Sequence, residues 1–110
     1  MHEDDNIRLR HILDAGKEAL AFSSGKTRKD LNTNRMLVHS LVRVIEIIGE
    51  AASKVSDDLK GSHPEIPWAD IVGMRNHLIH AYFDVDLDIL WNTVTKDLPP
   101  LISKIEQIIR

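Results

Sequence analysis

The stretch RMLVHSLVRVIEIIGEAASKV, residues 35–55, decides the fold, because apolar side chains recur in it at every third or fourth position. This spacing predicts an amphipathic helix that begins near Thr27 or Asn32 and ends at Val55. Such a long helix with a wide apolar surface is expected to pack on the core and on a further surface. Its stripe consists of Leu37, Leu41, Val44, Ile45, Ile48, Ala52 and Val55, widened by Val38, Val42 and Gly49.

The flanking segments show the same helical spacing. They predict one helix over 5–23, ended by Gly25 in a left-handed conformation, and another that starts near Pro67 and continues through Ile79 toward Tyr82. Residues 56–67 read as a loop with one short turn. A fourth helix is expected over 86–96, and a last one capped by Asp97, with Pro99-Pro100 marking a break. Asp84–Leu90 alternates but is too acidic for a strand, so the predicted fold is an all-α bundle of four to five helices.

Composition limits the class of protein. The 110 residues are 43% hydrophobic and 28% charged, which predicts a single globular domain over 1–110. The absence of cysteine excludes disulfides, thiolate metal sites and cysteine nucleophiles. The acidic N-terminus does not resemble a signal peptide, and no apolar run approaches the roughly 20 residues of a membrane span. We therefore expect a cytoplasmic protein with no membrane partner.

Arg75 is unusual, because it takes a position that continues the apolar series of the third predicted helix. A structural interpretation is that its side chain reaches water or pairs with Glu46 or Glu50. A functional interpretation starts from Asn76 and His80, which would lie one helical turn apart. Arg75 and His80 would be about 140° apart around the same helix. Either the long arginine reaches toward the histidine, or a two-fold dimer brings two such helices to a shared cleft.

Metal ligands are weakly indicated. His77 and His80 are three residues apart, with no third ligand at a metal-binding spacing. Asp84, Asp86 and Asp88 fail the calcium-loop pattern and are better read as an acidic turn that favours the start of the next helix. The sequence indicates neither a metal nor a cofactor.

Charge is distributed unevenly along the chain. The formal net charge is −3, which argues against a generally basic nucleic-acid binder, yet residues 26–43 contain five basic residues and one acid. Within this segment Arg35, His39 and Arg43 are spaced by four and would form a basic ridge on one helix face. The ridge is either an ordinary solvated face or a track for an RNA phosphate backbone.

Histidine and arginine are suited to one reaction in particular. Cleavage of RNA without a metal needs a base for the 2′-hydroxyl proton, an acid for the leaving oxygen and a cation for the phosphorane charge. Histidine titrates near neutral pH, and arginine presents a fork that matches phosphate oxygens. The chain has no glycine-rich phosphate loop and no serine nucleophile elbow that would indicate another chemistry.

The run Arg75-Asn76-His77-Leu78-Ile79-His80-Ala81-Tyr82 resembles the signature of the HEPN domain. More closely, the chain resembles the HepT-like toxins that are encoded beside minimal nucleotidyltransferase antitoxins. The resemblance covers most of the chain, and the other phrases that carry it are Ile47–Ala52, His63–Trp68, Gly73–Asn76, Tyr82–Trp91 and Asp97–Pro100.

This resemblance implies a HEPN helical bundle that forms a two-fold homodimer with the active-site cleft at the interface. It implies a metal-independent endoribonuclease of a type VII-like toxin–antitoxin system, with RNA as substrate and a nucleotidyltransferase antitoxin as partner. Arg75 and His80 would be the catalytic pair, and Asn76 would orient the site. Tyr82 would receive AMP from the antitoxin, which would place a bulky anion near the arginine. A purely structural alternative for Tyr82 is a hydroxyl that caps the third helix.

Two other classes of function remain open. The cleft could bind a nucleotide or dock the nucleotidyltransferase without turnover, which would make the chain a regulatory subunit. Alternatively, the chain could be a structural helical dimer in which Arg75 is a paired core residue. These readings differ on His80→Ala, which abolishes RNA cleavage with folding intact only if the chain is the nuclease.

Overall fold

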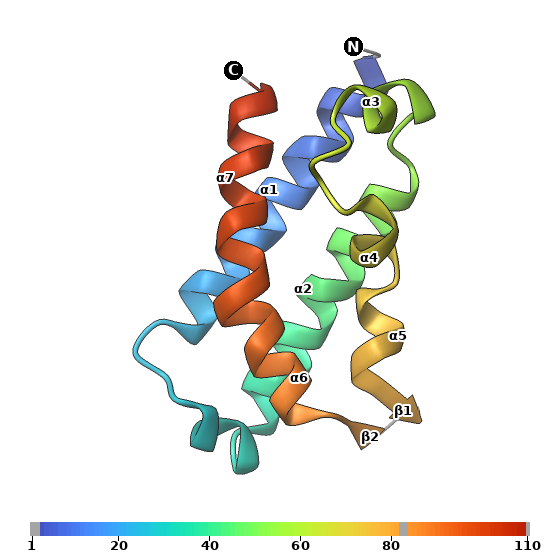
Figure 1. Ribbon diagram of the computed structural model, residues 1–110. Helices are drawn as coiled ribbons and strands as arrows, with labels where there is room; N and C mark the ends of the chain where they lie inside the picture. Colours follow the sequence, from blue (N-terminus) through green and yellow to red (C-terminus); the bar gives the residue numbers. More distant parts are fainter. Residues whose placement is uncertain (1–2, 82–83, 110) are drawn as a thin grey trace.

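Three long helices form the body of the molecule. The computed structural model describes residues 3–81 and 84–109. Helices α1 (Glu3–Ser23), α2 (Arg35–Ser53) and α7 (Leu98–Ile109) lie side by side, with α1 packed against both of the others (Figure 1). The predicted all-α bundle is confirmed.

The apolar stripes of these helices form one core. Burying a large aliphatic side chain contributes about 1.5–3 kcal/mol, so the members with no contact to water dominate its stability. The side chains that are at most 1% exposed on the three long helices are Leu9, Ile12, Ala19, Leu41, Ile45, Ile48, Ala52, Leu98 and Ile105. The helical spacing of residues 35–55 therefore indicated the buried face correctly.

Two glycines set how closely the helices approach. A Cβ at Gly16 would lie 2.8 Å from Cγ1 of Ile102, on α7. A Cβ at Gly49 would lie 3.2 Å from the carbonyl oxygen of Val72. Both contacts are closer than a side chain normally allows, so these glycines permit the tight packing of α1 on α7 and of α2 on the segment that contains Val72.

The segment before α2 differs from the prediction of one continuous helix from Thr27 or Asn32. Gly25 has the expected left-handed conformation, with φ of 73°. A short 3-10 helix, η1 (Arg28–Asn32), follows, and the chain then turns before α2 begins. Asn34 causes this separation, because its side chain accepts a hydrogen bond from the N–H of Leu37 at 3.0 Å and caps α2.

The predicted loop over 56–67 contains a further helix, α3 (Asp57–Ser62). Ser56 caps it by accepting a hydrogen bond from the N–H of Leu59 at 3.2 Å. Asp5, only 2% exposed, accepts bonds from the N–H and the hydroxyl of Ser56 at 2.8 and 2.5 Å. A buried carboxylate needs such partners, and here it ties α3 to the start of α1.

The prediction of one helix from Pro67 to beyond Ile79 is wrong. The chain forms α4 (Trp68–Val72) and α5 (Met74–Leu78), and then the antiparallel strands β1 (Ile79–Ala81) and β2 (Asp84–Val85). After Leu78 the backbone becomes extended, and the carbonyl of Leu78 accepts a hydrogen bond from the N–H of Asp86 at 2.7 Å. The carbonyl of Leu78 lies at the end of α5, where carbonyls lack a partner within the helix, and it is paired instead with a residue beyond β2. The acidic segment that begins at Asp84 therefore does contribute a strand.

The predicted break at Pro99-Pro100 is also absent. Helix α6 (Leu87–Asn92) continues through a π-helical turn, η2 (Thr93–Asp97), directly into α7, so Asp97 does not cap a separate helix. Proline rings clash with the carbonyl four residues earlier in a regular helix. The wider π turn lies where those carbonyls are, and this accommodates both rings.

The two strands form a hairpin at the end of the molecule opposite the two chain ends (Figure 1). Among the helices of residues 3–81 and 84–109, none is long and apolar enough to span a bilayer.

Candidate active site

Arg75 is held by a carboxylate from another helix. Its Nε donates to Oε2 of Glu46, on α2, at 2.8 Å. The Arg75 side chain is 47% exposed, so it both reaches water and pairs with an acid, as the structural interpretation of its position predicted. Of the two acidic partners considered from the sequence, Glu46 is the one that pairs with it. Arg75 therefore lies at the surface, three residues before the end of α5.

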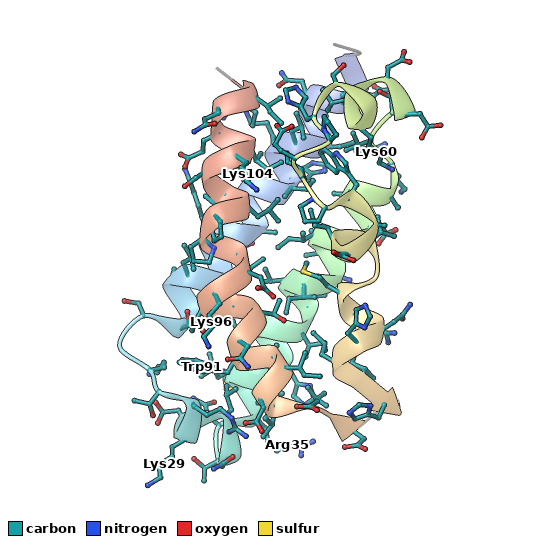
Figure 2. All side chains as sticks on the ribbon, in the orientation of Figure 1. Lys29, Arg35, Lys60, Trp91, Lys96 and Lys104 are labelled. Atoms are coloured by element: carbon teal, nitrogen blue, oxygen red, sulfur yellow. The ribbon has the colours of Figure 1, made fainter. Side chains whose placement is uncertain are left out.

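A groove of about 460 Å³ lies on one side of this ion pair. Two arginines, Arg35 and Arg75, and two acids, Glu46 and Asp84, line it. His39 and Asn32 are its other polar lining residues, and the rest of its lining is apolar. Figure 2 shows Arg35 at the end of the molecule where the hairpin lies. The apolar lining residues are Leu31, Val38, Val42, Ile79, Val85 and Leu87.

A second groove of about 280 Å³ lies on the other side. Its lining includes Arg43, Glu50 and Asn76, together with Gly49 and Val72. Arg75 and Glu46 line both grooves, so their ion pair lies at the junction. The predicted basic ridge therefore flanks Arg75, with Arg35 and His39 in the first groove and Arg43 in the second.

His80 lies on β1 and faces α6. Its Nε2 lies 3.4 Å from Oδ2 of Asp86, and its side chain is 56% exposed. The other oxygen of Asp86 accepts the N–H of Ile89 at 3.0 Å and caps α6. This backbone hydrogen bond, followed by the contact with His80, lowers the pKa of Asp86 below its usual value of 3.8. Asp86 is therefore an anion at neutral pH.

The structure brings together only some of the predicted site residues. Arg75 and Asn76 share the second groove, but His80 lines neither groove. Asn76 and His80 are not one helical turn apart, because α5 ends between them. Tyr82 lies outside the described residues, so its modification and its capping role stay predictions.

Sequence reasoning placed Asp86 at a helix start but missed its second contact. An aspartate just before a helical segment is a recognisable cap. Its link to His80 follows from the hairpin, which the continuous-helix prediction excluded. His77 is exposed on α5. Over residues 3–81 and 84–109, no group of three or more histidines and carboxylates is arranged to hold a metal ion.

Comparison with known proteins gives a consistent result. A family model described as "Ribonuclease HepT-like" matches residues 12–108. A Methanocaldococcus jannaschii protein named "Putative RNase MJ1380" is 34% identical over 98 residues, covering 89% of this chain and 90% of that protein. A Thermococcus cleftensis protein named "Probable ribonuclease HepT" is 44% identical over 80 residues, covering 73% of each chain. No solved structure matches the chain significantly.

Proposed function

The chain belongs to the HepT-like ribonuclease family, and from that premise we propose that it is a metal-independent endoribonuclease that acts as a toxin. The observation that carries this proposal is the position of Arg75. It lies at the junction of two grooves that also contain Arg35, His39 and Arg43. Glu46, Glu50 and Asp84 also line these grooves, so the site is not a uniformly basic surface. Arg75 at their meeting point, with a further arginine in each groove, is suited to bind a phosphate of an RNA strand.

Arg75 has donor groups left for such a contact. Its Nε is occupied by Glu46, and within the described part of the chain no hydrogen bond or ion pair uses its two terminal nitrogens. Those nitrogens can donate to the two non-bridging oxygens of the scissile phosphate and stabilise the additional charge of the phosphorane. Asn76, the next residue in the chain, lines the second groove and would orient the substrate there.

His80 would move the protons. As a base it takes the proton of the 2′-hydroxyl while the 2′-oxygen attacks the phosphorus. The bond to the 5′-oxygen breaks, and that oxygen receives a proton from a protonated histidine. The products are a 2′,3′-cyclic phosphate and a 5′-hydroxyl, with no metal or redox step.

A homodimer would complete the site. His80 lines neither of the two grooves described above, so within the described residues these grooves do not contain all the proposed groups. A two-fold axis beside α5 and the hairpin would bring His80 of the partner subunit toward the groove that contains Arg75. This arrangement agrees with the cleft between two motifs that the resemblance implies.

Control of the toxin would act on the same region. We propose that a nucleotidyltransferase antitoxin transfers AMP to Tyr82, two residues after His80 in the chain. The added phosphate is anionic and would repel the RNA phosphate by charge and occupy its space.

The direct test is cleavage of total cellular RNA in EDTA by the purified chain, with Tyr82 shown to be unmodified by intact mass. We expect discrete fragments from the wild type and at least a hundredfold slower cleavage by His80→Ala and Arg75→Ala. His77→Ala is the matched control, because His77 is exposed on the same segment and has no assigned role. Equal loss in all three variants, or no cleavage by the unmodified wild type, would contradict the proposal.

One observation favours a second function. The first groove combines apolar lining residues with two arginines, Arg35 and Arg75, and such a surface would also hold a free nucleotide without turnover. In that case the wild type binds a nucleotide measurably by calorimetry and cleaves no RNA. The chain would then be a regulatory subunit of the nucleotidyltransferase.

A further inference from the structure

Asp86 is fixed at three points. Its backbone N–H donates to the carbonyl of Leu78 at 2.7 Å, at the end of α5. Its Oδ1 accepts the N–H of Ile89 at 3.0 Å, and its Oδ2 lies 3.4 Å from Nε2 of His80. The carboxylate therefore has little freedom to turn away, although the histidine that it faces is mostly exposed.

We propose that Asp86 is a positioning residue that sets the orientation and the tautomer of His80. This inference rests on the proposed function, in which His80 carries protons. A carboxylate can only accept a hydrogen bond, so Nε2 of His80 must carry the proton in this contact. The lone pair of the neutral imidazole is then on Nδ1, which faces away from Asp86 and is the atom that takes the proton of the 2′-hydroxyl.

The other charged groups around β1 are engaged elsewhere or make no such contact. Arg75 on α5 pairs with Glu46. Asp88 on α6 accepts from Nε of Arg28 at 2.7 Å. Neither His77 on α5 nor Asp84 on β2 forms a hydrogen bond or ion pair with His80 within residues 3–81 and 84–109. Asp86 is thus the carboxylate that faces this ring.

The fixed carboxylate also suits the charged form of the histidine. When Nδ1 takes the proton, the imidazolium has an N–H at both nitrogens, and the one at Nε2 still points to Asp86. The anion then stabilises the new positive charge without changing place. The proton on Nδ1 can later pass to the 5′-oxygen as its bond to phosphorus breaks, so the histidine returns to its starting tautomer.

The test is Asp86→Asn. Asparagine is as good a helix cap as aspartate, so its oxygen can still accept the N–H of Ile89. Its amide nitrogen would then face His80 and donate to Nε2, which forces the ring proton onto Nδ1. We expect the ¹⁵N shifts of histidine-labelled protein to report a proton on Nε2 in the wild type and on Nδ1 in the variant. His80→Ala assigns the signal.

Turnover should follow the tautomer. We expect kcat to fall by about ten- to a hundredfold in Asp86→Asn, as for other residues that orient a reacting imidazole, while KM stays within about twofold. Asp88→Asn is the matched control, because it removes a neighbouring carboxylate of α6 that does not contact His80, and it should change neither the tautomer nor kcat. Asp86→Ser keeps a capping hydroxyl but is too short to reach His80, and it should also reduce kcat.

An unchanged tautomer of His80 in a folded Asp86→Asn variant would overturn the inference. The same holds for an unchanged kcat in both Asp86 variants of an active nuclease. If the tautomer changes but the wild type cleaves no RNA, the positioning role is supported and the proposed nuclease function fails. The two proposals are therefore distinguishable.

Discussion

The three-helix body and the segment from α5 to α6 share one apolar core but differ in the polar contacts at their surface. In the body, side chains such as Ile45 and Leu9 are fully buried and have no polar role. In the α5–α6 segment, Leu78 and Leu90 are also fully buried, but the side chains proposed to act on RNA, Arg75 and His80, are exposed, and each makes one polar contact among the residues that the structure describes. Stability scales with buried apolar area, whereas exposed ion pairs contribute little to it. The residues that stabilise the fold are thus not the ones proposed to carry out the chemistry.

The largest effect should come from the body. Ile45→Ala leaves a cavity in the centre of α2, and we expect it to lower the free energy of unfolding by about 2–5 kcal/mol. Arg75→Ala removes an exposed pair and should cost less than about 1 kcal/mol. Urea denaturation followed by circular dichroism measures both. An equally large loss of unfolding free energy in Arg75→Ala would show that the arginine is a structural residue, as in the interpretation of the chain as a structural helical dimer.

A smaller effect should come from the residue that links the two regions. Glu46 belongs to α2 but holds Arg75, so Glu46→Ala should free the guanidinium and slow RNA cleavage by about tenfold or more, with stability changed by less than about 1 kcal/mol. Initial cleavage rates, with melting as a fold control, measure this. Glu50→Ala is the matched variant, because Glu50 lines the same groove but pairs with Lys54 at 3.8 Å. Equal rates in the two variants would contradict the role of Glu46.

The smallest effect should be a change in the stability of the protein at acid pH. The folded state lowers the pKa of Asp86 below 3.8, mainly through the N–H of Ile89. Because the pKa of Asp86 is lower in the folded protein than in the unfolded chain, the ionised carboxylate stabilises the fold when the pH is above the pKa of the unfolded chain. This stabilisation is lost as the pH falls through the pKa of the folded protein. The difference in melting temperature between wild type and Asp86→Asn should therefore be present at pH 6 and shrink below about pH 4. A difference that does not depend on pH would show that the charge of Asp86 does not stabilise the fold.

The two regions also differ in how well they could be predicted. The periodicity of residues 35–55 identified the buried face of α2, because a continuous apolar stripe at helical spacing can face the core in only one rotation of the helix. The same reasoning failed over residues 67–82, where Gly73 separates two short helices and the chain turns into a strand after Leu78. The residue types and their order predicted ribonuclease chemistry at Arg75 and His80. The predicted continuous helix, however, placed both residues on one helix, whereas they lie on α5 and β1. Short elements are decided by partners elsewhere in the chain, and periodicity contains no information about those partners.

The all-α class, the core stripes, the left-handed Gly25 and the membership of a ribonuclease family could all be predicted from the sequence, because each depends on local spacing or on residue identity. Three features became visible only in the folded chain. Glu46 holds Arg75, Asp86 joins the cap of α6 to His80, and the basic ridge is divided between two grooves. These contacts join residues on different elements, and their geometry depends on where helices end and how closely glycines let them pack. The free energy of the buried core sets that geometry, and the polar side chains then bind whichever partners it brings within reach.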